Sequence, residues 1–257
     1  MCHVTAIAAL AVLATGCGDT SEKGANAATE TARTETGTTP NATTSSTPAA
    51  NPGTTIRFEA SDGVPLEGEF FPGRSGRAPA VILIHEYRGG PEQWRELVPV
   101  LQRAGYAVLN YASRSPQEID ETVLARDVIG AVAALRKRDD VDPRRIGLVG
   151  ASIGGSAAVW AIGVHHNVPV RAAVGLTAVE GPALIDVATK GRFRPHDLLL
   201  IADKKEFSQV QNIRDDAKGR GVTTWMSPFN GHGVRMLPSP EVKQKVLGWL
   251  RSHLGAS

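Results

Sequence analysis

The sequence feature that most constrains the fold is an apolar run that ends in a serine framed by glycines. Ile146 to Val149 is apolar, and Gly150, Ser152 and Gly154 follow as G-x-S-x-G before small residues that can open a helix. A reactive serine between a strand and a helix sits on a very sharp turn, with which side chains at the flanking positions would collide. The helix start adds free backbone N–H groups and the positive end of a dipole. The motif therefore predicts a nucleophile, although an ordinary glycine-rich turn can look the same.

The rest of the chain supplies the context by alternating short apolar runs with helical stretches. Ala80 to Ile84 (AVILI) is continuously apolar, which is typical of a strand buried on both faces of a sheet. This alternation predicts an α/β fold with a mostly parallel, doubly wound sheet and helices on both faces. Between Leu176 and Asp197 there is room for only one small helix, so we expect a minimal cap. Strands are expected at 55–60, 66–71, 80–84, 106–110, 145–149, 170–176, 197–202 and 222–227, and helices at 91–104, 118–138, 153–164, 182–189, 208–220 and 239–254.

The N-terminal part has a different composition from the rest of the chain. Val4 to Ala14 is an apolar run that is too short to span a bilayer but typical of an export signal, so residues 1–17 are predicted to be a signal peptide. Residues 18–53 contain no Val, Ile, Leu, Met or aromatic residue. Such a segment cannot bury enough apolar surface to offset its ordering entropy, so it is predicted to be a disordered tether. Residues 54–257 are then the folded domain.

The end of the predicted export signal also contains a pattern that bears on lipid attachment. Thr15-Gly16-Cys17 places small residues directly before a cysteine, which resembles the lipobox of bacterial lipoproteins. The resemblance implies that Cys17 is lipidated and that the protein is extracytoplasmic, with a membrane as its partner through the lipid anchor. The alternative is a plain secretory signal with an incidental cysteine.

Charge and cysteine content exclude several classes of function. The chain has 28 basic and 26 acidic residues, so nothing in its charge indicates binding to nucleic acid. Cys2 and Cys17 both precede the predicted domain, so no disulfide framework or thiolate metal site is available there. No G-x-x-x-x-G-K-[ST] or H-E-x-x-H pattern is present, which argues against nucleotide hydrolysis and zinc-protease chemistry. We expect neither a metal nor an organic cofactor, and the oligomeric state stays open.

A catalytic serine needs a base, and the base needs a third group that holds its tautomer. His232 is the one histidine that is both late in the chain and in a predicted loop, Asn230-Gly231-His232-Gly233. Its flanking glycines let that loop bring the imidazole over the strand ends. His253 lies near the end of the last predicted helix, where a histidine more simply interacts with the helix dipole. His232 is therefore the predicted base.

The order of these elements and the site positions resemble the α/β-hydrolase fold over about residues 54–254, and most of all its compact dienelactone-hydrolase-like branch. In that fold the residues follow in the order serine, acid, histidine. The family's acid lies four residues past the position of Ala202, which implies Glu206. Asp203 is the alternative acid, or else a turn former. Dienelactone hydrolases use a cysteine nucleophile and this chain has Ser152, so their substrate is not carried over.

An oxyanion hole needs backbone N–H donors, so loop geometry matters more than side-chain identity. The N–H of Ile153, directly after the nucleophile, is the expected first donor. The loop His85-Glu86-Tyr87-Arg88-Gly89-Gly90 resembles the H-E-x-x-G form in dienelactone hydrolases, which implies the N–H of Tyr87 as the second. His85 is expected to be structural. A charge on Glu86 would oppose an oxyanion unless it is paired, and Arg88 or Arg114 is the candidate partner.

Together these residues predict a serine hydrolase that cleaves a small-molecule carboxylic ester through an acyl-enzyme on Ser152. The same triad also serves peptidases, thioesterases and acyltransferases, which the sequence does not separate. A non-catalytic envelope lipoprotein that keeps the fold as a binding module is the alternative of another class.

Overall fold

The computed structural model describes residues 52–74, 76–114 and 120–255. These residues belong to one compact unit, Thr47–Ser257. The predicted signal peptide, the predicted lipidation site Cys17 and nearly all of the predicted tether lie outside the described residues. The first strand begins at Thr54, where the folded domain is predicted to begin.

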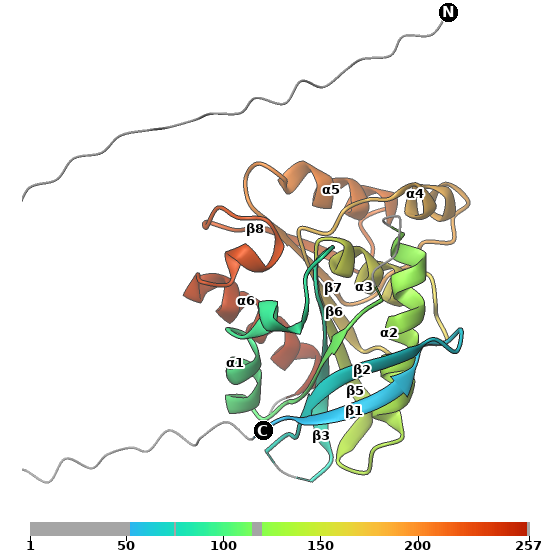
Figure 1. The fold of residues 1–257 in the computed structure, drawn as a ribbon. Coiled ribbons are helices and arrows are strands. Elements are labelled where there is room, and N and C mark those ends of the chain that lie inside the picture. The colour runs from blue at the N-terminus through green and yellow to red at the C-terminus, as the bar shows by residue number, and fades with distance from the viewer. Residues whose placement is uncertain (1–51, 75, 115–119, 256–257) are drawn as a thin grey trace, which may run out of the picture. The chain divides into compact units, whose positions relative to one another are not determined.

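Eight strands form one sheet in the described part of the chain, in the order β1-β2-β4-β3-β5-β6-β7-β8 (Figure 1). Strand β2 pairs antiparallel with β1 and with β4, and every other neighbouring pair is parallel. The strands are β1 (Thr54–Glu59), β2 (Pro65–Phe71), β3 (Ala78–Ile84), β4 (Ala107–Ala112), β5 (Val141–Ala151), β6 (Ala172–Leu176), β7 (Leu198–Ala202) and β8 (Val222–Met226).

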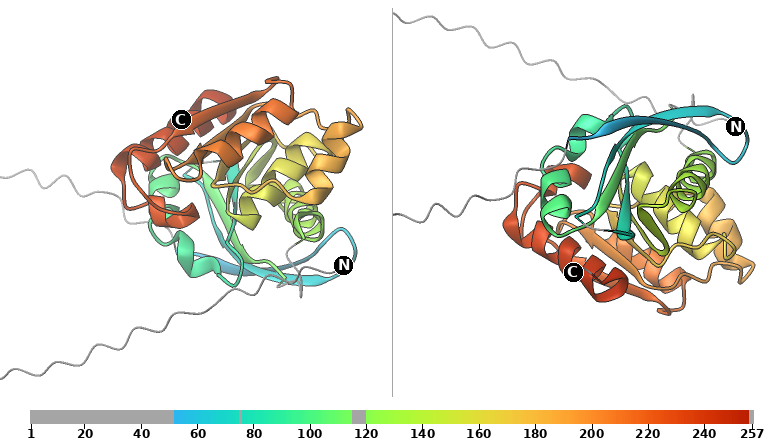
Figure 2. Two further views of the ribbon diagram at one scale, coloured as in Figure 1. Left: turned by 90° about the horizontal axis from the view of Figure 1, so that it is seen from above. Right: turned by 90° about the horizontal axis from the view of Figure 1, so that it is seen from below.

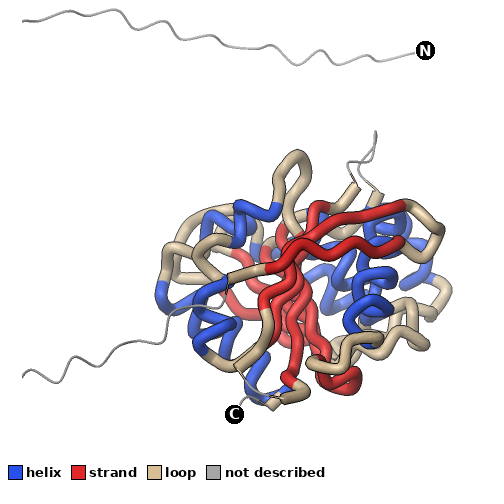
Figure 3. The backbone as a smooth tube through the Cα atoms, turned by 60° about the horizontal axis from the view of Figure 1, so that its bottom comes forward, coloured by secondary structure: helices blue, strands red, loops and turns tan. Residues whose placement is uncertain are grey.

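Helices cover both faces of this sheet, and Figures 2 and 3 show the twisted row of strands between them. One buried apolar cluster joins α1 and α6 to one face, and a second joins α2, α3, α4 and α5 to the other. The α-helices are α1 (Val98–Arg103), α2 (Glu121–Arg136), α3 (Ile153–Gly163), α4 (Pro182–Thr189), α5 (Phe207–Asp216) and α6 (Pro240–Leu254), and the 3-10 helices are η1 (Pro91–Trp94) and η2 (Gly233–Met236). The predicted architecture is therefore confirmed.

Several predicted boundaries differ from the structure; α5, for example, ends at Asp216 rather than at residue 220. Two of the differences have a clear physical reason, and proline explains the first. The expected helix over 91–104 is divided into η1 and α1, because Pro99 lacks an N–H and its ring would clash with the carbonyl of residue 95 in a continuous helix. The second is the start of β5, which lies at Val141 rather than at Arg145. Ala78 pairs with Val141 and Ala80 with Ile146, so the register shifts and the intervening residues bulge from the sheet.

The arrangement concentrates functional positions at one edge of the sheet. Strands β3, β6 and β7 are buried along their whole length, and β5 is buried from Ile146 to Ala151. These strands are parallel, so they end at the same edge of the sheet. Ligands of open α/β sheets bind at this carboxyl edge. Between β6 and β7 the chain forms only the short helix α4, as the predicted minimal cap requires. None of the helices in the described ranges has the length and apolarity needed to cross a bilayer.

Candidate active site

Ser152 lies on the turn between β5 and α3 with a strained backbone. Its φ is 52° and its ψ is −122°, a conformation that residues other than glycine rarely adopt and that costs of the order of 1–3 kcal/mol. A Cβ at Gly150 would collide with the Gly154 carbonyl, and a Cβ at Gly154 would collide with the carbonyls of Ile84 and His85. Both glycines of the motif are therefore required because other parts of the backbone approach them closely. This is the steric reason that the G-x-S-x-G spacing predicts.

The close approach of Gly154 to the end of β3 also brings the two expected oxyanion donors together. The first helical bond of α3 runs from the N–H of Ser156 to the carbonyl of Ser152, at 3.0 Å, so the N–H of Ile153 lies before the helical ladder. Ile153 and Tyr87 line the same small cavity, together with Arg88 and the side chain of His85. The structure thus places both residues beside one space at the carboxyl edge.

His85 fixes the direction of the Tyr87 N–H. The amide of Ser113 donates to Nε2 of His85 at 3.0 Å, so Nδ1 carries the ring hydrogen and donates to the carbonyl of Glu86 at 2.8 Å. The Gly89 amide donates to that same carbonyl at 3.0 Å. Because a trans peptide directs its C=O and N–H to opposite sides, holding the Glu86 carbonyl also holds the N–H of Tyr87 pointing away from it. His85 therefore has a structural role, as expected, and it orients the loop that is predicted to carry the second oxyanion donor.

His232 and Glu206 meet at the carboxyl edge, although 26 residues separate them in the chain. Nδ1 of His232 lies 2.9 Å from Oε1 and 3.1 Å from Oε2 of Glu206. A carboxylate only accepts hydrogen bonds, so Nδ1 carries the hydrogen and Nε2 is left as the basic nitrogen. Glu206 precedes the first residue of α5, and the half-buried pair keeps contact with solvent.

Asp203, the alternative acid, faces the backbone instead of the imidazole. Its Oδ1 accepts from the amides of Lys205 and Glu206 at 2.9 and 3.1 Å, and its Oδ2 accepts from the Gly231 amide at 3.1 Å. Burial raises the pKa of Asp203, but these three amide bonds outweigh it, so the pKa lies below its ordinary value. Asp203 is therefore a turn former that ties the Glu206 turn to the loop of His232.

The histidine loop, residues 230–234, lies beside the nucleophile turn. The Gly233 amide donates to Oγ1 of Thr177 at 3.1 Å, and Thr177 directly follows β6. A Cβ built on Gly233 would lie 3.3 Å from Cβ of Ala151, the residue before Ser152. Sequence reasoning missed Thr177, which is fully buried with a φ of 49°. In the sequence, only its position at the end of a predicted buried strand could have indicated that Thr177 lies near the site.

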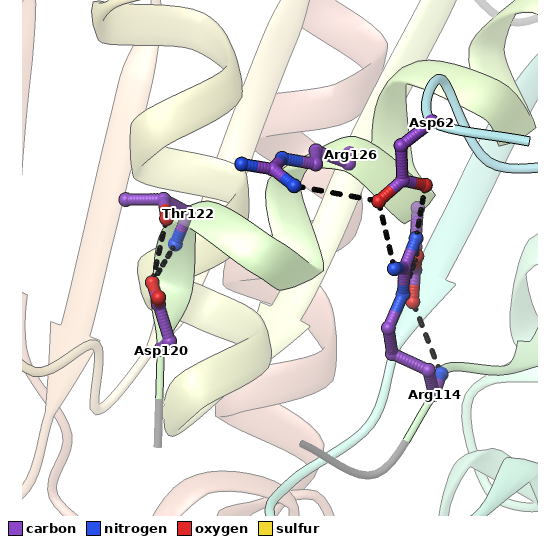
Figure 4. Close-up of polar contacts among 6 residues, drawn as sticks. Asp62, Arg114, Asp120, Thr122 and Arg126 are labelled. Carbon is purple, nitrogen blue, oxygen red and sulfur yellow. Dashed lines mark hydrogen bonds and ion pairs between the residues drawn. The ribbon is translucent and has the colours of Figure 1, made fainter. Parts of the chain in front are cut away.

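The predicted partner of Glu86 is wrong. Arg114 binds Asp62 through both terminal nitrogens, at 2.9 and 2.6 Å, and Asp127 through Nε at 2.6 Å, so its charge is already compensated (Figure 4). The guanidinium of Arg88 lies 5.2 Å from the centre of the Tyr87 ring. Glu86 instead accepts from the Val234 amide through Oε1, at 2.8 Å. Asp62 accepts from both terminal nitrogens of Arg114 and Asp127 accepts from Nε, so these two carboxylates take up the fork of the guanidinium.

No group of three or more His, Cys, Asp or Glu side chains within residues 52–74, 76–114 and 120–255 is arranged to hold a metal ion. The structure joins His232 to the Glu206 carboxylate and places the histidine loop beside the turn that carries the strained Ser152. The two candidate backbone donors line one cavity at the same edge of the sheet. Such an arrangement can activate a hydroxyl for attack on a carbonyl and stabilise the oxyanion that results.

Comparison with protein families finds a match over residues 118–183, which include Ser152, to the Prolyl oligopeptidase family (Peptidase_S9). Among curated proteins, an uncharacterized protein of Mycobacterium tuberculosis is 35% identical over 42% of this chain. The thiohydrolase aneE of Aspergillus aculeatus is 30% identical over 41% of it. The chain spans less than half of these relatives, 40% and 36% of their lengths.

Solved structures resemble the described domain more extensively. The Pyrococcus furiosus esterase Pf2001 superimposes with a TM-score of 0.64 and 18% identity, over 79% of this chain and 91% of the esterase. A dienelactone hydrolase of Anabaena variabilis superimposes with a TM-score of 0.65 and 18% identity, over 79% of this chain and all of the other (100%). Together with the strand order, these likenesses show that the chain has the α/β-hydrolase fold.

Proposed function

We propose that this protein is a serine hydrolase that cleaves carboxylic esters through an acyl-enzyme on Ser152. The observation that carries the proposal is the pair of hydrogen-bond distances between the Glu206 carboxylate and Nδ1 of His232, 2.9 and 3.1 Å. In chain order the three residues follow the sequence nucleophile, acid, histidine that α/β-hydrolases use. The strained Ser152 supports the same reading, since such strain clusters at functional sites.

The mechanism that we propose follows from the roles assigned to these residues. Nε2 of His232 takes the proton of the Ser152 hydroxyl as its oxygen attacks the ester carbonyl, and Glu206 stabilises the imidazolium that forms. The N–H groups of Ile153 and Tyr87 donate to the oxyanion of the tetrahedral intermediate. His232 then gives its proton to the departing alcohol. In the second half it activates water, which releases the acid and restores Ser152.

Ester specificity is the finer part of the proposal. It is supported by the resemblance to the esterase and to the dienelactone hydrolase, whose names describe ester and lactone cleavage. The short segment between β6 and β7 leaves no folded lid over the carboxyl edge, which favours short-chain or exposed esters. Strong preference for emulsified long-chain triglycerides over a short soluble ester would contradict this specificity.

Thioester cleavage is the second candidate, favoured by the resemblance to thiohydrolase aneE. The match to the Prolyl oligopeptidase family keeps peptide cleavage as a further alternative with the same triad. Acyl transfer and a non-catalytic binding role are the remaining readings from the residues alone. A panel of esters, thioesters and amides of the same aminoacyl group separates ester, thioester and peptide cleavage, because only the leaving group then varies.

Covalent labelling tests the catalytic proposal itself. A fluorophosphonate should label the protein stoichiometrically, because it captures a serine activated by a base. Ser152→Ala should abolish the label, whereas Ser252→Ala on α6 should leave it unchanged. The proposal would be contradicted if the wild-type protein took up no label, or if the Ser152→Ala protein took up as much label as the wild-type protein.

We also propose that Cys17 anchors the protein to a membrane as an extracytoplasmic lipoprotein. The support is the apolar run before Thr15-Gly16-Cys17. In a bacterial host fed a labelled fatty acid, the wild-type chain should carry the label and fractionate with membranes. Cys17→Ala should lose both properties. Unlabelled wild-type protein in the soluble fraction would favour a plain secretory signal instead.

A further inference from the structure

The histidine loop is held by three side chains from three different strand ends. Asp203, after β7, accepts from the Gly231 amide at 3.1 Å, and Thr177, after β6, accepts from the Gly233 amide at 3.1 Å. Glu86, after β3, accepts from the Val234 amide at 2.8 Å. The amides on both sides of His232 are thereby fixed, so the position of the imidazole depends on these three acceptors.

Glu86 differs from the other two acceptors because its own backbone belongs to the oxyanion loop. Its carbonyl is held by His85 and by the Gly89 amide, which directs the N–H of Tyr87 as described above. Its amide donates to Oε1 of Gln93 at 3.1 Å. One residue therefore has its main chain fixed in the loop that carries a proposed oxyanion donor and its carboxylate fixed in the loop that carries the proposed base.

The shape of the histidine loop is built around this carboxylate. Gly233 has a φ of +55°, and a Cβ on it would collide with Oε1 of Glu86. The carboxylate thus occupies the space that a side chain at position 233 would take. The bond from Val234 spans 148 residues of sequence, so it joins two segments that nothing local keeps together.

We propose that Glu86 is a positioning residue that links the oxyanion loop to the histidine loop, so that the Tyr87 N–H and the His232 imidazole are placed together. The inference rests on the proposed function. It also accounts for a carboxylate beside the proposed oxyanion site: the Val234 amide donates to Oε1 of Glu86, and Glu86 forms no ion pair within the described residues. The contact is a hydrogen bond to a charged group, whose loss is expected to lower the rate by about 10- to 100-fold.

Two substitutions in the full chain separate the hydrogen bond from the charge. Glu86→Ala removes the acceptor and should lower kcat for a short ester, and the fluorophosphonate labelling rate, by about 10- to 100-fold with KM changed little. Glu86→Gln keeps an oxygen acceptor and should recover most of the rate. Full activity in Glu86→Ala overturns the proposal, and so does a loss in Glu86→Gln as large as in Glu86→Ala. Should Glu86→Ala not fold, Glu86→Met keeps the length of the side chain and lacks the acceptor.

Hydrogen exchange tests the link without using activity. In the Ser152→Ala background, Glu86→Ala should accelerate exchange at the Val234 amide, and Glu86→Gln should leave it close to the parent. Equal protection in all three proteins overturns the link. If the wild-type protein takes up no fluorophosphonate, the proposed function fails, while the exchange result still decides whether Glu86 holds the histidine loop.

Discussion

Two carboxylate clusters in the domain differ in the nitrogen-containing group that each one binds. In the arginine cluster, Asp62 and Asp127 bind the guanidinium of Arg114, and Arg126 adds a weaker contact of 3.4 Å to Asp62 (Figure 4). In the acid–histidine pair, the Glu206 carboxylate binds the ring of His232 and no other side chain of the described residues. The Asp127 side chain is 0% exposed, whereas those of His232 and Glu206 are 29% and 25% exposed.

The difference teaches which cluster is structural. Arginine is charged at all accessible pH values, and here its donors are divided between carboxylates from the β1–β2 turn and from α2, so the cluster ties these segments together. Bonds from Arg114 hold the pKa of Asp62 well below its ordinary value. Histidine can gain and lose a proton near neutral pH, and no group within the described ranges bonds Nε2 of His232. The charges of the arginine cluster are paired with one another, whereas the acid–histidine pair leaves Nε2 of His232 available to accept a proton.

The largest expected effect comes from breaking the acid–histidine pair. Glu206→Gln should lower kcat for a short ester by roughly 10⁴-fold, by analogy with loss of the triad aspartate in serine proteases, because the imidazole loses its tautomer and the stabilisation of its charge. Steady-state kinetics measure this, and circular dichroism checks that the variant folds.

Asp203→Asn is the matched control for Glu206→Gln. It leaves the contact between Glu206 and His232 in place and weakens only the bonds to the backbone amides. We expect a loss of kcat at least tenfold smaller than in Glu206→Gln. The reverse order would identify Asp203 as the triad acid.

Breaking the arginine cluster should change stability rather than chemistry. Asp127→Ala leaves Arg114 without its buried partner and should lower the free energy of unfolding by about 3 kcal/mol. Glu67→Ala, which breaks the exposed pair with Arg57, should have little effect. Denaturant unfolding compares the two, and equal losses would show that burial does not set the importance of the pair.

A smaller effect is expected from Arg114→Lys. An ammonium keeps the charge but cannot reproduce the fork that binds Asp62 and Asp127 together, so we expect a loss of about 1–2 kcal/mol in the free energy of unfolding. Unchanged stability would mean that charge alone, without geometry, holds the cluster. The same denaturant curves provide the measurement.

The last effect is a dependence of stability on pH and concerns a carboxyl pair, Glu180 and Asp216. Burial, followed by a hydrogen bond and the charge of Asp216, raises the pKa of Glu180 from 4.5 to about 7. The folded state therefore binds more protons than the unfolded state between these values, so stability should fall as pH rises from 4.5 to about 7 and level off above. Glu180→Gln cannot titrate and should flatten that part of the melting temperature profile. An identical slope in both proteins would contradict the assignment.

Local sequence was sufficient for the elements of the fold because the apolar runs are long and well separated. Ala80 to Ile84 reads as a buried strand wherever it lies, and the glycines around Ser152 predict the sharp turn that the structure contains. The break before Pro99 was equally present in the sequence, since proline cannot continue a helix. The register shift at Val141 was not, because it depends on pairing with β3.

The sequence by itself determined the strand–turn–helix around Ser152, the loop in which glycines flank His232, and two neighbouring candidates for the acid. Only the tertiary structure decided that Glu206 faces the imidazole while Asp203 faces amides, and that Glu86 bonds Val234 rather than an arginine. The physical reason is the separation along the chain of the groups that interact. Backbone conformation follows from neighbours along the chain, whereas the partner of a carboxylate depends on which distant donor the folded sheet brings within 3 Å.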